Sequence, residues 1–223
     1  MTPTALLAAL QLGDSAFPSG AFTQSYGLET LVAERAVTNA DDVEAVLAAH
    51  LRHRLGRADL PALLAAHSAA ADADVALVLR IDAALTAVKM TREERNASHR
   101  IGARLMAEAE RLVAPTPILI SSSRPHNAAV VFALAGFAMG LAARECALTY
   151  SYSFVSSLAV AAMRLLRVGH GEVQAVIRRS HPLIQRAVDE AESIPWDALC
   201  PFAPGLDLAA ARHERLAARL FAS

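Results

Sequence analysis

The run NAAVVFALAGFAMGLAARECALTYSYSFVSSLAVAAM, residues 127–163, decides the fold class of this chain. It holds two stretches without charge, Asn127–Ala143 and Cys146–Met163, and each is near the roughly 20 residues that a helix needs to cross a bilayer. One interpretation is therefore a small integral membrane helical protein. Alanine dominates the first stretch, and hydroxyl-bearing side chains are frequent in the second. This composition favours the other interpretation, two helices buried in the core of a bundle.

Within this run, Gly136 and Gly140 form a GxxxG step. Glycines at this spacing clear one face of a helix, so that a second helix can approach closely. In a bundle the step predicts close helix packing.

The composition of the whole chain predicts an all-α fold. About a fifth of the 223 residues are alanine, the best helix former and a poor strand former, and only 5% are aromatic. The chain is 54% hydrophobic with a net charge of −1, which excludes intrinsic disorder and gives no electrostatic case for nucleic-acid binding. We expect a single-domain bundle of roughly eight to ten helices. Residues 1–193 would form the helical core, and residues 194–223 a connector and a C-terminal partner-binding helix, packed on or extending from the same domain.

Local signals predict where several helices begin and end. Asp41 is the expected N-cap of one helix. The segment TREE predicts a capping box, in which the Thr91 hydroxyl bonds the backbone and the Glu94 side chain reaches back. Pro182 is expected to kink or break its helix. A final amphipathic helix is predicted over Leu208–Phe221.

No motif in the sequence indicates a catalytic centre or a bound cofactor. The chain lacks GxxxxGK[ST], GxGxxG after a strand, GxSxG and HExxH, so it carries no nucleotide-binding P-loop of its own. Cys146 and Cys200 lie far apart without CxxC spacing, which indicates neither a disulfide framework nor a zinc motif. The start MTPTALLAAL has no basic n-region of a secretory signal, so we expect a cytoplasmic protein. Because the catalytic motifs named above are absent from the sequence, we also expect that the protein is not an enzyme.

Two histidines offer an alternative function. His50 and His53 are three residues apart on one predicted helix, a spacing that can place two imidazoles on one metal ion. They would make the chain a nickel-binding chaperone or an enzyme. The competing interpretation places both on a solvated helix face beside Arg52 and Arg54, without a third ligand.

The C-terminal segment ARHERLAARLFAS, residues 211–223, has apolar Leu220 and Phe221 close to its end. Such a helix can dock on the core of its own chain. It can equally be offered to a partner as an amphipathic helix that fills a groove. Composition does not decide between these two interpretations.

The segment LQLGDSAFPSGAFTQSYGLE, residues 10–29, closely resembles the N-terminal signature of the UreF family of urease accessory proteins. Gln24 stands where that family usually has histidine, which argues against metal binding at this position. Four further blocks match in the same order: EERNASHRIGARL (93–105), HNAAVVFALAGFAMGL (126–141), YSYSFVSSLAVAAMRLL (150–166) and HERLAARLFAS (213–223).

The resemblance implies a non-catalytic, all-helical accessory protein that forms homodimers. Its implied partners are the UreG GTPase, an adaptor called UreD or UreH, and apo-urease, to which the complex delivers nickel. The chain would modulate GTP hydrolysis or the hand-over of nickel. The resemblance implies no cofactor of its own, no nucleic acid and no membrane.

The same resemblance implies which residues bind partners. Arg219 matches the arginine of the family's RLF ending and would help to recruit the GTPase by pairing with a carboxylate. Leu220 and Phe221 would be apolar anchors, and His213 and Glu214 would orient the helix. The C-terminal Ser223 completes this set.

The N-terminal motif is implied to be either structural or part of an interface. A structural role is favoured, with Asp14 capping a helix and Gly20 making a turn. The motif comprises Asp14, Ser15, Phe17, Pro18, Gly20, Phe22, Ser25, Gly27 and Glu29.

Overall fold

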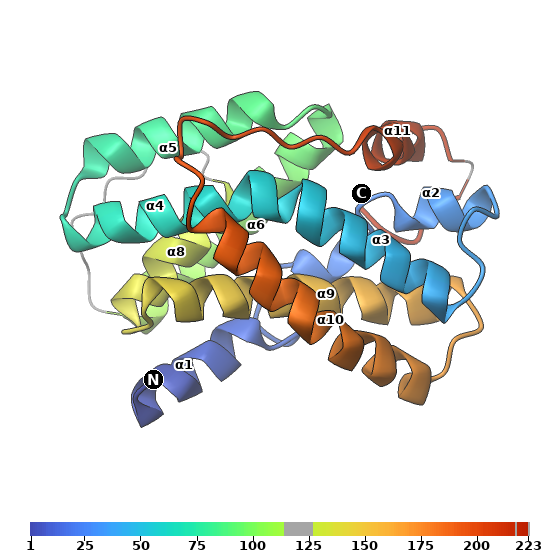
Figure 1. The fold of residues 1–223 in the computed structure, drawn as a ribbon, viewed down its shortest axis with the longest axis horizontal. Helices are drawn as coiled ribbons and strands as arrows, with labels where there is room; N and C mark the ends of the chain where they lie inside the picture. The colour runs from blue at the N-terminus through green and yellow to red at the C-terminus, as the bar shows by residue number, and fades with distance from the viewer. Residues whose placement is uncertain (114–126, 217, 223) are drawn as a thin grey trace.

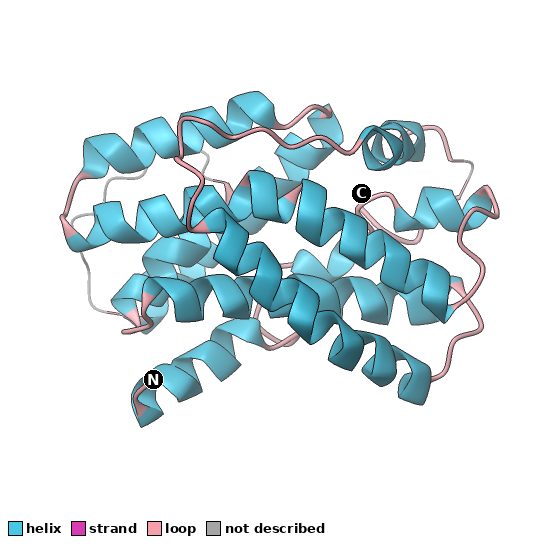
Figure 2. Cartoon of the chain, in the orientation of Figure 1, coloured by secondary structure: helices cyan, strands magenta, loops and turns pink. Residues whose placement is uncertain are grey.

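Helices make up all of the regular structure in the residues that the computed structural model describes, 1–113, 127–216 and 218–222 (Figure 2). This part of the chain contains ten α-helices and two 3₁₀ turns, which confirms the prediction of an all-α bundle. The helices are α1 Pro3–Gly13, α2 Leu28–Ala33, α3 Ala40–His53, α4 Asp59–Ala71, α5 Val75–Val88, α6 Arg92–Leu112, α8 Ala128–Ala138, α9 Ala143–Leu165, α10 His170–Ala191 and α11 Pro204–His213, and the 3₁₀ turns are η1 Ala21–Thr23 and η2 Leu55–Arg57.

The apolar run 127–163 forms the centre of the bundle as α8 and α9. Every residue of α8 from Ala128 to Gly136 is buried, because α4, α6 and α9 pack around this helix. α9 runs along the length of the molecule, and α10 crosses in front of it (Figure 1). A connector then leads from α10 back across the bundle to α11, which lies beside α2 (Figure 1).

The transmembrane interpretation of this run is not favoured. Among the described helices only α9 is long and apolar enough to cross a membrane, and 44% of that stretch is buried inside the protein. α8 has 11 residues and so spans about 16 Å, half of the roughly 30 Å of a hydrocarbon core. A hairpin of two spanning helices is therefore not formed by α8 and α9.

The two glycines of the GxxxG step have different roles. Gly136 packs against α9, since a Cβ on this residue would lie 2.5 Å from the Sγ of Cys146. Gly140 instead ends α8 in the left-handed conformation with φ 81°. Its N–H donates to the Phe137 carbonyl (3.0 Å) and the Leu141 N–H to the Gly136 carbonyl (2.9 Å), which is a Schellman motif. The prediction of close packing is right for Gly136 and wrong for Gly140.

Two predicted helix starts are corrected in detail. α3 is capped by Asn39 rather than Asp41, because the Asn39 side-chain oxygen accepts from the backbone N–H groups of the first turn. Thr91 caps α6 as predicted, by accepting from the Glu94 N–H (3.2 Å). The Glu94 side chain does not reach back to complete a capping box, because it pairs instead with Arg54, the residue that follows α3.

Two predicted helix ends also differ. Pro182 lies inside α10 and does not break it. Buried side chains before and after the proline, among them Ile177 and Ile184, lie on the side that packs against α3 and α9, and this packing outweighs a cost of about 3 kcal/mol. The final helix, predicted to reach Phe221, ends at His213.

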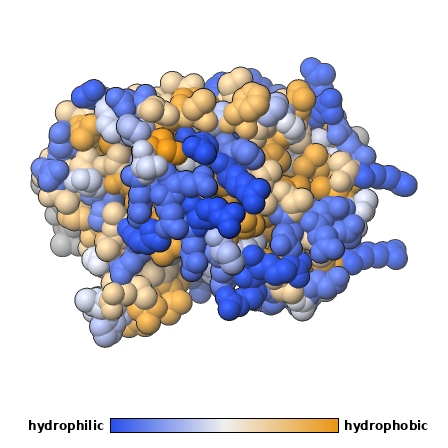
Figure 3. All heavy atoms as spheres, viewed as in Figure 1, coloured by the Kyte–Doolittle hydropathy of each residue, from blue (hydrophilic) through white to orange (hydrophobic). Residues whose placement is uncertain are grey.

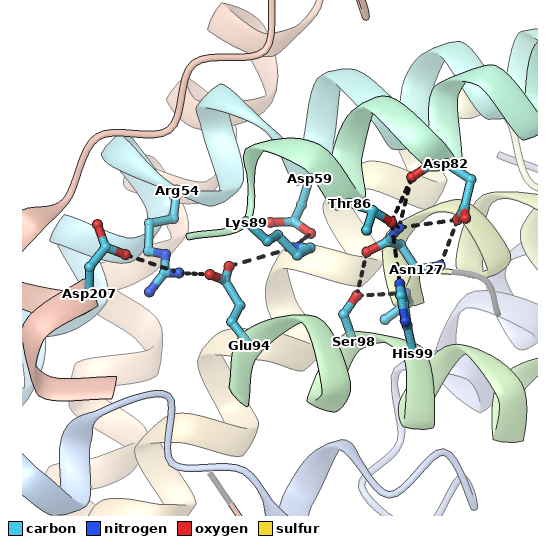
Figure 4. Close-up of polar contacts among 11 residues, drawn as sticks. Arg54, Asp59, Asp82, Thr86, Lys89, Glu94, Ser98, His99, Asn127 and Asp207 are labelled. Atoms are coloured by element: carbon cyan, nitrogen blue, oxygen red, sulfur yellow. Dashed lines mark hydrogen bonds and ion pairs between the residues drawn. The ribbon is translucent and has the colours of Figure 1, made fainter. Parts of the chain in front are cut away.

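A buried amide ties α8 to the helices beside it (Figure 4). Asn127 is fully buried, and its backbone N–H donates to the Asp82 carboxylate at 2.6 Å. Its side-chain nitrogen donates to the Thr86 hydroxyl (2.8 Å), and its side-chain oxygen accepts from the Ser98 hydroxyl (3.0 Å). α5, α6 and the start of α8 are thereby fixed to one another.

α1 projects from one end of the bundle and exposes a row of leucines. Leu6, Leu7 and Leu10 are 43%, 66% and 62% exposed. Figure 3 shows apolar surface gathered where this helix projects, whereas much of the surface over α3 and α10 is hydrophilic. Exposed apolar patches of this kind mark interfaces.

Substituting Gly136→Ala tests the packing of α8 on α9. The added methyl group meets the Cys146 sulfur, so we expect a loss of about 1–3 kcal/mol in the free energy of unfolding. Urea denaturation of the full chain measures it. Gly171→Ala on α10 is the matched control, because its Cβ meets no atom within 4 Å, and this variant should be neutral or more stable by up to about 1 kcal/mol. Equal free energies of unfolding for the two variants would contradict the close packing of α8 on α9 at Gly136.

Candidate functional site

The C-terminal tail meets the N-terminal motif at Glu29, near the start of α2. Its carboxylate accepts hydrogen bonds from the backbone N–H groups of Leu220 (2.7 Å) and Phe221 (3.3 Å). The next N–H, that of Ala222, donates to the Thr23 carbonyl at 2.9 Å. The last described residues therefore lie along the N-terminal motif, 191 and 192 positions away in sequence from Glu29.

His213, at the end of α11, joins the same carboxylate to a second one. Its Nε2 lies 2.8 Å from Glu29 and its Nδ1 lies 2.8 Å from Glu93 on α6. The ring is fully buried, and the glutamate side chains are 7% and 10% exposed. Each ring nitrogen of His213 therefore faces a carboxylate from a different helix. We name the group of Glu29, Glu93, His213 and the backbone of Leu220 and Phe221 the C-terminal clasp.

Gly27 allows α11 to approach the N-terminal motif. Its φ of 87° lies in the left-handed region, which favours glycine. A Cβ here would also come within 3.2 Å of the Ala209 side chain and 3.3 Å of the Ala210 backbone nitrogen. A side chain at this position would push α11 away, and His213 with it.

The clasp divides the predicted partner-binding residues into two groups. His213 and Phe221 are inside the protein, and the Phe221 ring is 5% exposed with the Arg164 guanidinium 5.9 Å from its centre. Leu220 is 72% exposed, and Arg219 and Glu214 are also exposed. The tail thus docks on its own chain and presents part of itself to solvent. Ser223 lies outside the described residues.

The N-terminal motif is divided in the same way. Gly20 has a φ of 76°, as a tight turn requires. Asp14 is the C-cap of α1, as a helix-capping role requires, and its carboxylate accepts from the Ala16 N–H (2.7 Å) in the turn that follows. The buried members are Phe17, Gly20, Ser25, Gly27 and Glu29, and the exposed members are Asp14, Ser15, Pro18 and Phe22.

Beside the clasp, an open groove of about 430 Å³ separates the start of α6 from the tail. An ion pair crosses it, with the Arg92 guanidinium 3.1 Å from the Glu214 carboxylate. Sequence reasoning assigned no individual role to the α6 residues of this groove, although polar side chains at positions 92, 96 and 100 share one helix face. The groove is lined by Arg92, Glu93, Asn96, Arg100, Glu214, Arg219 and Ala222.

The histidine pair does not form a metal site. His50 is buried, its ring lies 5.2 Å from that of Phe154, and its Nε2–H donates to the Tyr26 carbonyl (3.2 Å). Burial lowers the pKa of His50 to about 3, and nearby Arg54 adds to the effect. His53 is exposed. Within the described residues no group of three or more histidine, cysteine, aspartate or glutamate side chains could hold a metal ion, so the nickel-binding alternative is not favoured.

A second charged cluster holds the ends of several helices together (Figure 4). Lys89, the only lysine of the sequence, lies 2.9 Å from Asp59 and 3.6 Å from Glu94. Arg54 pairs with Glu94 and, at 3.3 Å, with Asp207 at the start of α11. Burial opposes the charged form of Lys89, but the two carboxylates outweigh burial and raise its pKa.

The cavity next to this charged cluster is small. It measures about 40 Å³, which is room for a few water molecules. The charged side chains that line it are paired with one another. The open groove beside the clasp is therefore the better candidate for a functional surface.

The depressed pKa of His50 predicts a pH dependence of stability. Between pH 6.5 and about 3 the unfolded chain takes up a proton at this residue and the folded chain does not. Stability is therefore lost as the pH falls, by up to about 1.4 kcal/mol per pH unit from this residue alone. Urea denaturation from pH 6.5 to 4.5 measures how the free energy of unfolding changes with pH. This slope should be shallower for His50→Gln than for the unsubstituted chain. Identical slopes would contradict the prediction that His50 stays unprotonated in the folded chain.

Glu29→Gln tests the clasp with little change in shape. The glutamine side chain has an NH₂ donor in place of one of the two acceptor oxygens. A donor that faces a backbone N–H group of the tail cannot accept its hydrogen bond, so the tail should be released. We expect hydrogen–deuterium exchange at Leu220 and Phe221 to become at least about tenfold faster, corresponding to the loss of about 1.4 kcal/mol of hydrogen bonding. Glu34→Gln, which removes an exposed ion pair with Arg212, is the control and should leave this exchange unchanged. Unchanged exchange in Glu29→Gln would show that the carboxylate does not hold the tail.

Comparison with known proteins identifies relatives along the whole chain. The family model described as UreF matches residues 37–181. The urease accessory protein UreF of Bacillus sp. strain TB-90 is 30% identical, with 98% of this chain and 99% of the relative covered. The protein of the same name from Chromohalobacter salexigens is 32% identical over 99% and 96% of the two chains, and that of Nostoc sp. strain PCC 7120 is 31% identical over 96% and 94%. The chain therefore belongs to the UreF family of urease accessory proteins.

Proposed function

We propose that this chain is a non-catalytic scaffold that recruits a UreG-type GTPase, together with the UreD/UreH adaptor, to apo-urease. In this role it modulates GTP hydrolysis or the hand-over of nickel during metal insertion, and it acts in the cytoplasm. The family assignment supports an accessory role rather than an enzymatic one.

The exposure of the docked tail is the observation that carries the proposal. The clasp pins the backbone at Leu220 and Phe221, while the Leu220 side chain is 72% exposed and Arg219 points into the groove region. A large apolar side chain in solvent next to a guanidinium suits a protein partner that buries the first and pairs with the second. Because the tail is already ordered, binding costs less conformational entropy than a free tail would.

A homodimer forms part of the same proposal. The exposed leucines of α1, Leu6, Leu7 and Leu10, support self-association, because they form apolar surface that no other described element covers. α8 is buried within one chain from Ala128 to Gly136 and so offers little surface to a second copy.

The Arg219→Ala variant tests recruitment. The guanidinium is exposed, so we expect the fold and the thermal unfolding temperature to be unchanged. Retention of the GTPase by the tagged chain in complex with its adaptor should fall at least about tenfold, since a charged hydrogen bond to a partner is worth about 1.5–3 kcal/mol.

Arg186→Ala is the matched control. Arg186 is an exposed arginine on α10, away from the clasp. The Arg186→Ala variant should retain the GTPase at the level of the unsubstituted chain. Normal GTPase retention by Arg219→Ala would refute the role of this residue, and absence of retention by the unsubstituted chain would refute the proposed function.

A further inference from the structure

The exposed face of α6 carries two arginines that have no ion partner among the described residues. Arg100 and Arg104 are one helical turn apart, about 6 Å along the axis, and both are exposed. Other arginines of this helix are paired, Arg92 with Glu214 and Arg111 with Glu108. No ion pair of Arg100, Arg104 or Arg219 occurs within the part of the chain that the structure describes.

The N-terminal motif fixes the position of one of these arginines. The Arg104 guanidinium lies directly over Gly20, in the space that a Cβ at that position would occupy. Gly20 therefore does more than make a turn, because its missing side chain lets Arg104 lie against the motif. The positively charged surface is thus built from α6, the N-terminal motif and the tail.

Glu93, which lines the groove beside these arginines, also has a buried oxygen without a hydrogen-bond donor among the described residues. The Glu93 side chain is nine-tenths buried, and its Oε1 is occupied by His213. Its Oε2 is buried and has no hydrogen-bond partner among the described residues. A buried carboxylate oxygen without a donor costs free energy, so the groove suits a ligand that brings a donor.

One kind of protein segment meets both requirements. The first turn of a helix has free backbone N–H groups, and acidic side chains are favoured there. Its carboxylates would pair with Arg100, Arg104 and Arg219. Its N–H groups would satisfy the Glu93 oxygen once a side-chain movement opens that buried atom to the groove. A basic segment would instead meet three guanidinium groups of its own charge.

We propose that the groove between α6 and the tail, with Arg100 and Arg104 on its flank, binds an acidic helix N-terminus of the GTPase. This inference rests on the proposed function, in which the tail recruits that partner. It adds a second contact surface and states the chemistry of the partner segment.

Charge reversal on α6 tests the inference. The full chain in complex with its adaptor is immobilised, and GTPase binding is measured at low and at physiological salt. Arg100→Glu combined with Arg104→Glu should weaken binding by about tenfold or more and reduce its salt dependence, because the attracting charges are removed. Arg100→Gln combined with Arg104→Gln, which adds no negative charge, should weaken binding less.

Arg167→Glu combined with Arg186→Glu is the control, since it makes the same change of net charge at exposed positions outside the groove. Binding by this control should stay within about twofold of the unsubstituted chain. An equal loss in both double variants, or no loss in the α6 variant while the unsubstituted chain still binds, would overturn the inference and leave the proposed function standing. No binding by the unsubstituted chain would overturn both.

Discussion

The carboxylate of Glu29 is the interaction on which the C-terminal structure depends. It receives two backbone N–H groups of the tail and the imidazole of His213, and that imidazole in turn contacts Glu93. A carboxylate this deeply buried is stable only while such donors reach it. The interaction therefore makes the order of the tail and the burial of Glu29 depend on each other.

This dependence explains why distant parts of the sequence form one surface. Gly27 lets α11 approach, α11 places His213, and His213 connects α2 with α6. The outcome is a tail whose apolar Phe221 is hidden while its neighbours face solvent. The proposed scaffold role would gain from this arrangement, because a partner would meet an ordered surface instead of a flexible end.

The sequence predicts the fold class well because that depends on local properties. Alanine content and the uncharged run 127–163 indicate buried helices, and the length of α8 agrees. Contacts between distant residues are not encoded locally. The Glu94 side chain satisfies the pattern of a capping box, yet Arg54 competes for it across the bundle. Likewise, the composition of the tail fits docking on its own chain and docking on a partner, and only the position of Glu29 separates the two.

A double-mutant cycle between Glu29 and His213 tests the central claim most directly. Glu29→Gln, His213→Gln and the combined variant are unfolded in urea, and the free energies of unfolding are compared with that of the unsubstituted chain. The clasp predicts that the two substitutions are not additive, with a coupling of about 1–3 kcal/mol, because each removes the same buried contact. Additive effects within about 0.5 kcal/mol would contradict the claim that this buried pair holds the C-terminal region on the N-terminal motif.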